Sequence, residues 1–248
     1  MPDVAIKVDS VTKRFGTRIV LDAINLEVHQ GETLVILGGS GSGKSTLLRL
    51  MIGNERPNGG DILVANGSGS GPVEKSLRDM TTEALDDYRR SIGVLFQSGA
   101  LFNSMSVFEN VALPLREHTD LEDETIQIMV KIKLELVGLR EHADKMPSEL
   151  SGGMKKRAGL ARAIALDPKI LFYDEPSAGL DPVTSAEIDQ LILDRPDLFV
   201  EVFSRSRHAL GGRRIGQALA QIFKLRTDVP HLNHRLINIT QIAMNAHP

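Results

Sequence analysis

Gly38-Gly-Ser-Gly-Ser-Gly-Lys-Ser45 is the stretch of this sequence that decides the fold. Its glycines have no Cβ atom, so the backbone can turn with several N–H groups facing inward and can approach a phosphate closely. The apolar residues 33–37 before it predict a buried strand, and residues 45–52 after it predict a helix. This order predicts a phosphate-binding loop in an α/β fold, with Lys44 bridging the β- and γ-phosphates and Ser45 holding Mg²⁺.

Two acidic residues, Asp174 and Glu175, follow a second apolar stretch at residues 170–173. A nucleotide site with Mg²⁺ needs a carboxylate at the end of a neighbouring strand. We therefore expect Asp174 to bind Mg²⁺ through water, and Glu175 to orient or deprotonate the attacking water. Paired acids after a strand are also common helix N-caps, but the phosphate-binding loop in the same chain favours the catalytic interpretation.

A third motif, Leu150-Ser-Gly-Gly153, opens a predicted helix. The Ser151 hydroxyl and the first backbone N–H groups of that helix would form a second anion site. Helix capping explains the serine, but it does not explain the two consecutive glycines after it. The motif therefore predicts a site that faces outward, toward the nucleotide of a partner.

The order of these motifs resembles that of the ATP-binding-cassette (ABC) family of ATPases throughout residues 1–193. The resemblance implies that Lys44, Glu175 and Gln97 are catalytic, Gln97 being the Q-loop residue directly after the apolar residues 93–96. It implies that Ser45, Gln97 and Asp174 hold Mg²⁺. The residues that it places around ATP are Phe15, Gly38, Gly39, Ser40, Gly41, Ser42, Gly43, Lys44, Ser45, Thr46, Ser151, Gly152, Gly153 and Asp181.

Phe15 and Asp181 enter this set through the resemblance alone. Phe15 looks like the aromatic residue that stacks on adenine, although a lone phenylalanine is more often part of a core. Asp181 ends Ser177-Ala-Gly-Leu-Asp181, which resembles the D-loop.

The same resemblance implies the architecture. Residues 1–248 would form a single P-loop NTPase domain of the ABC type, with a RecA-like core, an antiparallel β subdomain and a helical subdomain inserted at residues 98–167. Two such domains would associate head to tail, so that the Ser151 motif of each closes over the nucleotide of the other. Apolar patterning predicts strands at 4–9, 18–28 and 61–64 and helices at 82–91, 107–114, 122–137 and 153–165.

Three further stretches carry a narrower resemblance: Val94-Leu-Phe-Gln-Ser-Gly-Ala-Leu-Phe-Asn103, Leu113-Pro-Leu-Arg-Glu-His118 and Ser148-Glu-Leu-Ser-Gly-Gly-Met154. They look like the ATPase subunits of Mla/Mce-type phospholipid transporters, also called toluene-tolerance transporters. This implies ATP hydrolysis that powers lipid transport through a membrane permease, with a lipid-binding substrate protein as an indirect partner. The chain would be cytoplasmic, held on the inner face of the cell membrane by a permease that docks near residues 102–107.

Composition is consistent with this location. The chain has no cysteine, which suits a reducing compartment. No apolar run approaches the roughly 20 residues that a membrane helix needs, and the start of the chain has no signal-peptide pattern. The formal net charge of −3 argues against nucleic acid as a partner. The basic residues Lys155, Lys156, Arg157 and Arg162 are interpreted as a solvated helix face.

The sequence departs from the family pattern after Leu193. The family has an apolar strand that ends in Ser/Thr-His, whose histidine contacts the γ-phosphate, but here Ser204-Arg-Ser-Arg207 precedes His208. A histidine in such a run is more often simply exposed than a switch. Two hypotheses stay open for the atypical residues 194–248: a changed reading frame that removes the last core strands, or a native tail specialised for a partner.

Two other functions also stay open. A soluble ABC ATPase of translation or repair would need no permease, but such proteins usually carry two cassettes in one chain, and this chain has one. A catalytically impaired ATP-binding remnant would fit the unusual C-terminus. Either protein would still bind ATP through the loop that contains Lys44.

Overall fold

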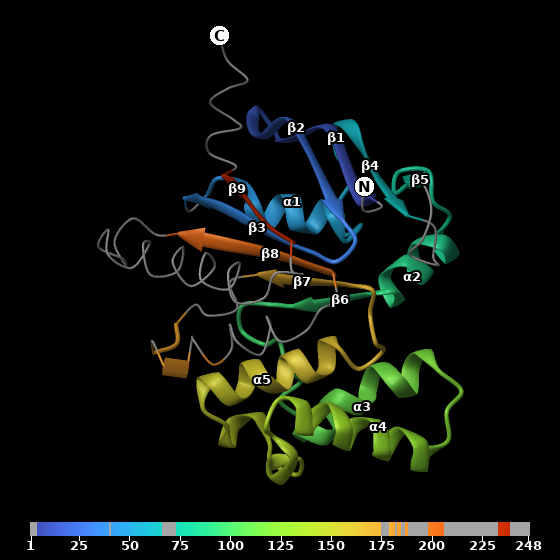
Figure 1. The fold of residues 1–248 in the computed structure, drawn as a ribbon, viewed down its shortest axis with the longest axis vertical. Coiled ribbons are helices and arrows are strands. Elements are labelled where there is room, and N and C mark those ends of the chain that lie inside the picture. Colours follow the sequence, from blue (N-terminus) through green and yellow to red (C-terminus); the bar gives the residue numbers. More distant parts are fainter. Residues whose placement is uncertain are drawn as a thin grey trace. The chain divides into compact units, whose positions relative to one another are not determined.

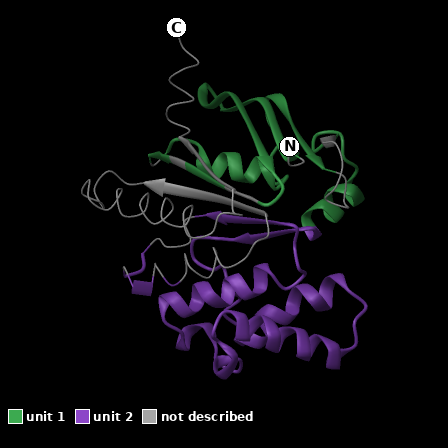
Figure 2. Ribbon diagram, viewed as in Figure 1, with its two compact units in different colours: residues 1–89, 196–248 green, residues 90–195 purple. Residues whose placement is uncertain are grey.

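The computed structural model describes residues 4–39, 41–65, 73–174, 179–181, 183, 184, 187, 198–205 and 233–238. The chain forms two compact units, one of residues 1–89 and 196–248 and the other of residues 90–195 (Figure 2). Ser40, Glu175 and His208, for which the sequence predicts or considers roles, lie outside the described residues.

An antiparallel sheet forms part of the first unit (Figure 1). Its strands, in the order β2-β1-β4-β5, are β1 (Val4–Phe15), β2 (Arg18–His29), β4 (Gly59–Ala65) and β5 (Val73–Ser76). The turn between β1 and β2 contains Gly16, whose φ of 59° suits a tight hairpin. Ile6 and Val8 in β1 and Ile24 in β2 are fully buried, as the alternating pattern predicts.

The strand before the phosphate-binding loop, β3 (Glu32–Gly39), has a parallel strand on each side. One partner is β8 (Leu198–Arg205), in which Phe199 lies opposite Thr33, and the other is β9 (Asn233–Asn238), in which Asn233 lies opposite Glu32. If a changed reading frame had altered the tail, we expected the last core strands to be missing. Residues 198–205 and 233–238 contradict that expectation, because each forms a strand beside β3. Within the described part of the tail, β8 pairs with one edge of β3 and β9 with the other.

Helix α1 (Lys44–Met51) follows the loop and lies against β3 and β8. Helix α2 (Thr82–Arg90) ends the N-terminal part of the first unit. Tyr88 in α2 is buried, and its hydroxyl donates a 2.7 Å hydrogen bond to Met51 O at the end of α1. Burial raises the pKa of Tyr88, so this phenol stays protonated and keeps the two helix ends together.

The second unit contains two parallel strands and a helical layer. Its strands β6 (Ile92–Leu95) and β7 (Ile170–Asp174) pair from Ile92 opposite Ile170 to Leu95 opposite Tyr173. Its helices are α3 (Val107–His118), α4 (Asp123–Leu136) and α5 (Gly152–Ala163), with short 3-10 turns at Arg140–His142 and Pro147–Glu149. Both α4 and α5 pack against α3, as Figure 1 shows in green and yellow.

Helix α3 is longer than predicted and continues past Pro114 to His118. The predicted helix ended at residue 114, and proline removes one helical hydrogen bond. Burial of Val111 and Leu115 on either side of the proline favours continuation. At its other end, Ser106 and Glu109 form a capping box in which each side chain accepts from the backbone N–H of the other.

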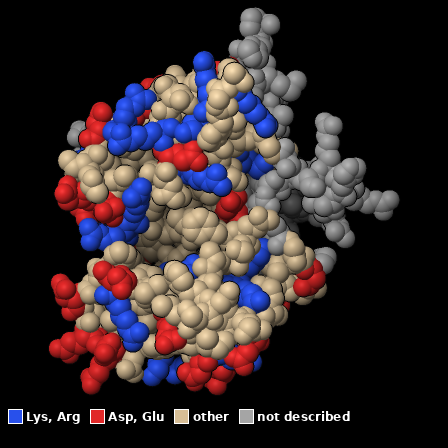
Figure 3. All heavy atoms as spheres, turned by 180° about the vertical axis from the view of Figure 1, so that it is seen from behind, with Lys and Arg blue, Asp and Glu red and all other residues tan. Residues whose placement is uncertain are grey.

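Within the described residues, no helix combines the length and the apolar character that crossing a membrane requires. The face drawn in Figure 3 carries lysine and arginine side chains interspersed with acidic ones.

Candidate functional site

The loop before α1 has the backbone of an anion-binding turn. Gly41 and Gly43 have φ angles of 78° and 92°, a region that other residues rarely adopt. The Ser42 N–H donates to Gly39 O (3.2 Å) and closes the turn. A Cβ atom on Gly43 would lie 2.9 Å from Val20 O, so the loop also packs closely on β2. Glycine is therefore needed here for conformation and for space.

The same loop leads into an uncapped helix start. Gly43 is the N-cap of α1 and, as a glycine, has no side chain that could cap the helix. The first backbone N–H groups of α1 can therefore donate to an anion, and the helix dipole contributes roughly half a positive charge. Ser45 and Thr46, both partly exposed, lie in this first turn.

Lys44 lies over the loop. Its side chain is buried, and Nζ donates to Gly38 O (2.8 Å), Gly39 O (2.7 Å) and Ser42 Oγ (3.2 Å). These acceptors are neutral, so charged phosphate oxygens would form stronger, charge-assisted hydrogen bonds with the ammonium group. The lysine thus already lies at the loop where phosphates are predicted to bind.

Phe15, at the end of β1, exposes 49% of its surface. Lys13 Nζ lies 5.1 Å from the centroid of its ring, at cation–π distance. The alternative interpretation of Phe15 as a core residue is therefore wrong. Its exposed ring offers a face on which a base could stack.

Gln97 and Asp174 follow neighbouring parallel strands. Asp174 is the last residue of β7, and Gln97 comes shortly after the end of β6, beyond the pair of Leu95 with Tyr173. Because parallel strands end at the same edge of a sheet, the second unit places these two predicted residues at one edge. Gln97 is exposed and Asp174 is partly buried there.

The predicted metal ligands have suitable chemistry. Gln97 and Asp174, in the second unit, offer an amide oxygen and a carboxylate, and Ser45, in the first unit, offers a hydroxyl. Mg²⁺ prefers hard oxygen ligands of this kind and keeps several of its waters. The donor set therefore fits Mg²⁺. Clusters of three or more His, Cys, Asp or Glu side chains able to hold a metal do not occur in the described part of the chain.

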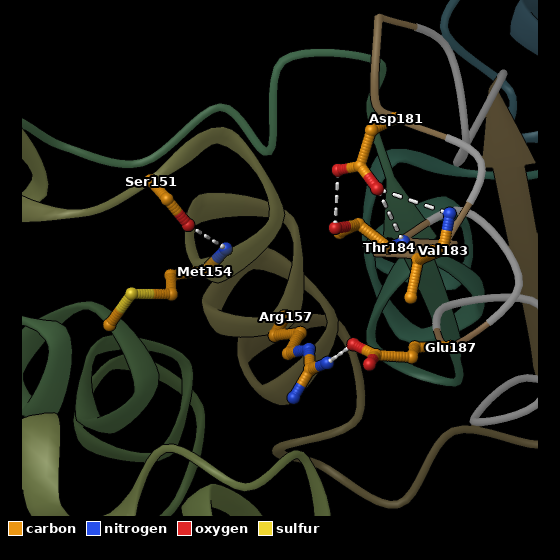
Figure 4. A network of polar contacts seen from close by, with 7 residues as sticks. All are labelled: Ser151, Met154, Arg157, Asp181, Val183, Thr184 and Glu187. Atoms are coloured by element: carbon orange, nitrogen blue, oxygen red, sulfur yellow. Dashed lines mark hydrogen bonds and ion pairs between the residues drawn. The ribbon is translucent and has the colours of Figure 1, made fainter.

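The start of α5 carries the predicted second anion site (Figure 4). Ser151 is exposed and is the N-cap, since its side chain accepts from Met154 N–H (3.2 Å). Gly152 is exposed, whereas Gly153 is buried against Thr184. The capping interpretation of the serine is therefore correct, and the second glycine has a packing role that the sequence did not reveal.

In Figure 4 the carboxylate of Asp181 points toward Val183 and Thr184 of the same chain. Its carboxylate accepts from the backbone N–H groups of Val183 and Thr184 (3.1 Å each) and from Thr184 Oγ1 (2.6 Å). The hydrogen bonds from Thr184, side chain first, hold the pKa of Asp181 below its ordinary value. The carboxylate is therefore kept ionised and oriented at the start of the segment that also presents Glu187 to Arg157.

Sequence reasoning missed two residues that shape the loop after Gln97. Asn110 is fully buried: its Oδ1 accepts from Phe102 N–H (2.8 Å), and its Nδ2 donates to the carbonyl oxygens of Phe102, Met105 and Ser106 at 2.9–3.1 Å. The signal that could have found it is an amide on the apolar face of a predicted helix.

Arg162 is the second missed residue, and it corrects the interpretation of the basic residues of α5 as a solvated face. Its guanidinium donates to Ala100 O (2.9 Å) and Gly99 O (3.1 Å). Desolvation by burial lowers its pKa, although an arginine remains charged. Lys156, on the same helix, is also buried.

Comparison with known proteins identifies the family. The family model described as ABC transporter matches residues 21–178. The "Probable ribonucleotide transport ATP-binding protein mkl" of Mycobacterium leprae (strain TN) is 48% identical over 191 residues, which are 77% of this chain and 53% of that protein. This chain therefore spans about half the length of the Mkl proteins.

Two relatives carry a different name. The "Intermembrane phospholipid transport system ATP-binding protein MlaF" of Haemophilus influenzae is 46% identical over 187 residues, covering 75% of this chain and 68% of that protein. MlaF of Escherichia coli (strain K12) is 48% identical over 177 residues, covering 71% and 63%.

Solved structures support the same fold. A dimeric, post-hydrolysis ATP-binding cassette, MJ0796 bound to ADP and Pi, aligns with a TM-score of 0.70 and 31% identity, over 81% of this chain and 88% of that one. CbiO1 of Clostridium perfringens, part of the ABC transporter complex cbiONQ, aligns with a TM-score of 0.71 and 28% identity, over 92% and 96%. The predicted α/β cassette fold is thereby confirmed, and the chain belongs to the ABC transporter family.

Proposed function

We propose that this chain binds ATP with Mg²⁺ and hydrolyses it as the motor subunit of a phospholipid transporter. The geometry of the loop around Lys44 carries the proposal. Two glycines with positive φ, an uncapped helix start and a buried ammonium group hydrogen-bonded to the loop together form a cradle for phosphates.

Each proposed role follows from the chemistry of the residue. Lys44 and the first N–H groups of α1 neutralise the phosphates, while Phe15 stacks on the base. Bound Mg²⁺, held by Ser45, Gln97 and Asp174, would supply positive charge between the phosphates. Glu175 orients or deprotonates the attacking water.

The proposal includes a second copy of the chain. Ser151 and Gly152 are exposed at the start of α5, where their polar groups can reach a nucleotide held by another subunit. The MJ0796 cassette, which is 31% identical, is described as dimeric. Head-to-tail closure would make Ser151 and Gly153 part of the partner's site, so an isolated monomer should hydrolyse ATP slowly.

The cargo and the permease are inferred from the relatives. MlaF proteins are named for intermembrane phospholipid transport, and they match this chain at 46–48% identity. The Mkl proteins, which match equally well, are named for ribonucleotide transport. We choose phospholipid because the MlaF match spans the larger share of the relative. The chain would act at the inner face of the membrane through its permease.

The test is ATP hydrolysis by the purified full-length chain, alone and in complex with its permease in phospholipid vesicles. Glu175→Gln and Lys44→Ala are expected to lower turnover by about a hundred-fold or more. Equal turnover of both variants and the wild type would disprove the assignment. ATP binding without phosphate release in any assembly would instead identify a catalytically impaired protein.

The vesicle assay also separates the cargo classes and the soluble alternative. Phospholipid transfer that depends on Glu175 supports the proposed cargo, whereas transfer of ribonucleotide alone would overturn it. Full hydrolysis that no permease alters would favour a soluble ABC ATPase.

A further inference from the structure

The turn at residues 96–99 contains Gln97. Its last residue, Gly99, and the next residue, Ala100, both have a left-handed backbone conformation. The Gly99 N–H donates to Phe96 O (2.8 Å) and closes this turn. Gly99 then has a φ of 74° and Ala100 a φ of 49°. The second value is uncommon for a residue with a side chain, so contacts from elsewhere must hold it.

Arg162 provides those contacts. One guanidinium nitrogen donates to Ala100 O and the other to Gly99 O, at 2.9 and 3.1 Å. The guanidinium carbon also lies 5.6 Å from the ring centroid of Phe102. A planar fork of donors can bind two successive carbonyl oxygens at once, which a lysine ammonium group cannot do with the same geometry.

The loop backbone also lies directly against α5. A Cβ atom on Gly159 would lie 2.8 Å from Gly99 O, and a Cβ atom on Gly99 would lie 2.8 Å from Lys155 O. Glycine at both positions therefore lets loop and helix approach without an intervening side chain. Ser151 caps the opposite end of this helix, which at 12 residues is about 18 Å long.

We propose that Arg162 is a positioning residue that makes the Gln97 turn and the Ser151 helix move as one body. The proposal rests on the proposed function, in which Gln97 serves the nucleotide of its own subunit and Ser151 that of the partner. A rigid helix with Ser151 at its start and Arg162 in its last turn would transmit a displacement of either group to the other.

Hydrogen exchange of the full-length chain tests the contact itself, without reference to activity. In Arg162→Ala, amides of residues 96–102 should exchange about ten-fold faster or more, because two charged hydrogen bonds are lost. Arg162→Lys should show the same change if Arg162→Ala does not fold. Arg140→Ala is the control, since Arg140 forms an exposed ion pair with Glu135 (3.3 Å) in the same unit. Exchange in 96–102 that matches this control would overturn the inference.

Kinetics then test the positioning role. We expect Arg162→Ala to lower kcat by about ten- to a hundred-fold while the Kd for ATP changes little, because Gln97 is misplaced and the phosphate loop is intact. The double variant Gln97→Ala, Arg162→Ala should be no slower than Gln97→Ala alone. A kcat equal to that of Arg140→Ala, or additive losses in the double variant, would overturn the inference.

The two proposals fail in different ways. If the wild type does not hydrolyse ATP, or if Gln97→Ala hydrolyses it normally, the proposed function or the role of Gln97 is wrong. Hydrogen exchange still decides whether Arg162 holds the turn.

Discussion

The methyl group of Thr184 fills the space beside Gly153, because a Cβ atom on residue 153 would lie 2.4 Å from Thr184 Cγ2. Thr184 is not free to rotate away, since its hydroxyl donates to Asp181 Oδ2 (2.6 Å). The second glycine of the motif is therefore required by packing within the chain, apart from any nucleotide.

Gly153→Ala should lower the free energy of unfolding by about 1–3 kcal/mol, the usual cost of overpacking. Gly152→Ala is the matched control on the same helix turn, because a Cβ atom there would lie 3.5 Å from Leu180 Cδ2, an ordinary contact. Urea unfolding measures both. In a Thr184→Ser background, which keeps the hydroxyl and removes the methyl, Gly153→Ala should become nearly neutral. Equal losses at 152 and 153 in the wild-type background would contradict this account.

Gly43→Ala should destabilise the first unit and abolish nucleotide binding. A side chain there requires a φ of 92° and lies 2.9 Å from Val20 O, so a cost above about 2 kcal/mol is expected. Gly39→Ala is the control for stability, because a Cβ atom on Gly39 meets nothing within 4 Å. Urea unfolding and titration with a fluorescent ATP analogue would show the contrast, and equal stability of the two variants would refute it.

Asn110→Ala should cost about 1–3 kcal/mol, because the part-buried Phe102 N–H and Met105 O lose the amide as a partner, while Phe102 O and Ser106 O keep their backbone donors. Asn110→Asp should be at least as harmful, since a carboxylate cannot donate to those carbonyls. Gln127→Ala, at an exposed position of α4, is the control. A loss for Asn110→Ala within about 0.5 kcal/mol of the control would disprove the role of the amide.

Asp181 should make stability depend on pH at the acid end. Its pKa is depressed in the folded chain, so its contribution is present above the ordinary aspartate value of about 3.9 and is lost as the pH falls through the lower folded value. The difference in unfolding free energy between wild type and Asp181→Asn should therefore be larger at pH 6 than at pH 3. Asp120→Asn serves as the control, because that exposed carboxylate makes no ion pair within the described residues. A difference that does not change with pH would contradict this role of the hydrogen bonds to Asp181.

Local patterns predicted much of the fold. The strand, glycine loop and helix around Lys44 are contiguous in sequence, so apolar periodicity and glycine spacing sufficed to locate β3 and α1. Helices α2, α4 and α5 likewise begin and end close to their predicted bounds. The prediction ended α3 at residue 114, but the helix continues past Pro114, because the cost of one lost hydrogen bond is smaller than the gain from burial on both sides of it.

Contacts between distant residues could not be predicted. Arg162 holds carbonyl oxygens 62 and 63 positions away, and nothing in a basic helical stretch distinguishes such an arginine from a solvated one. Strand β8 was missed because Ser204 and Arg205 interrupt its apolar pattern, although backbone pairing with β3 does not depend on side chains.

The pairing of β3 on both edges makes the nucleotide site a late product of synthesis. Residues 32–39 leave the ribosome well before their partners, residues 198–205 and 233–238, are made. At roughly 5–20 residues per second, the unpaired strand would wait on the order of ten seconds. A chain stopped before residue 198 would expose two open strand edges beside its phosphate loop, so premature termination would yield an aggregation-prone fragment rather than a slower motor.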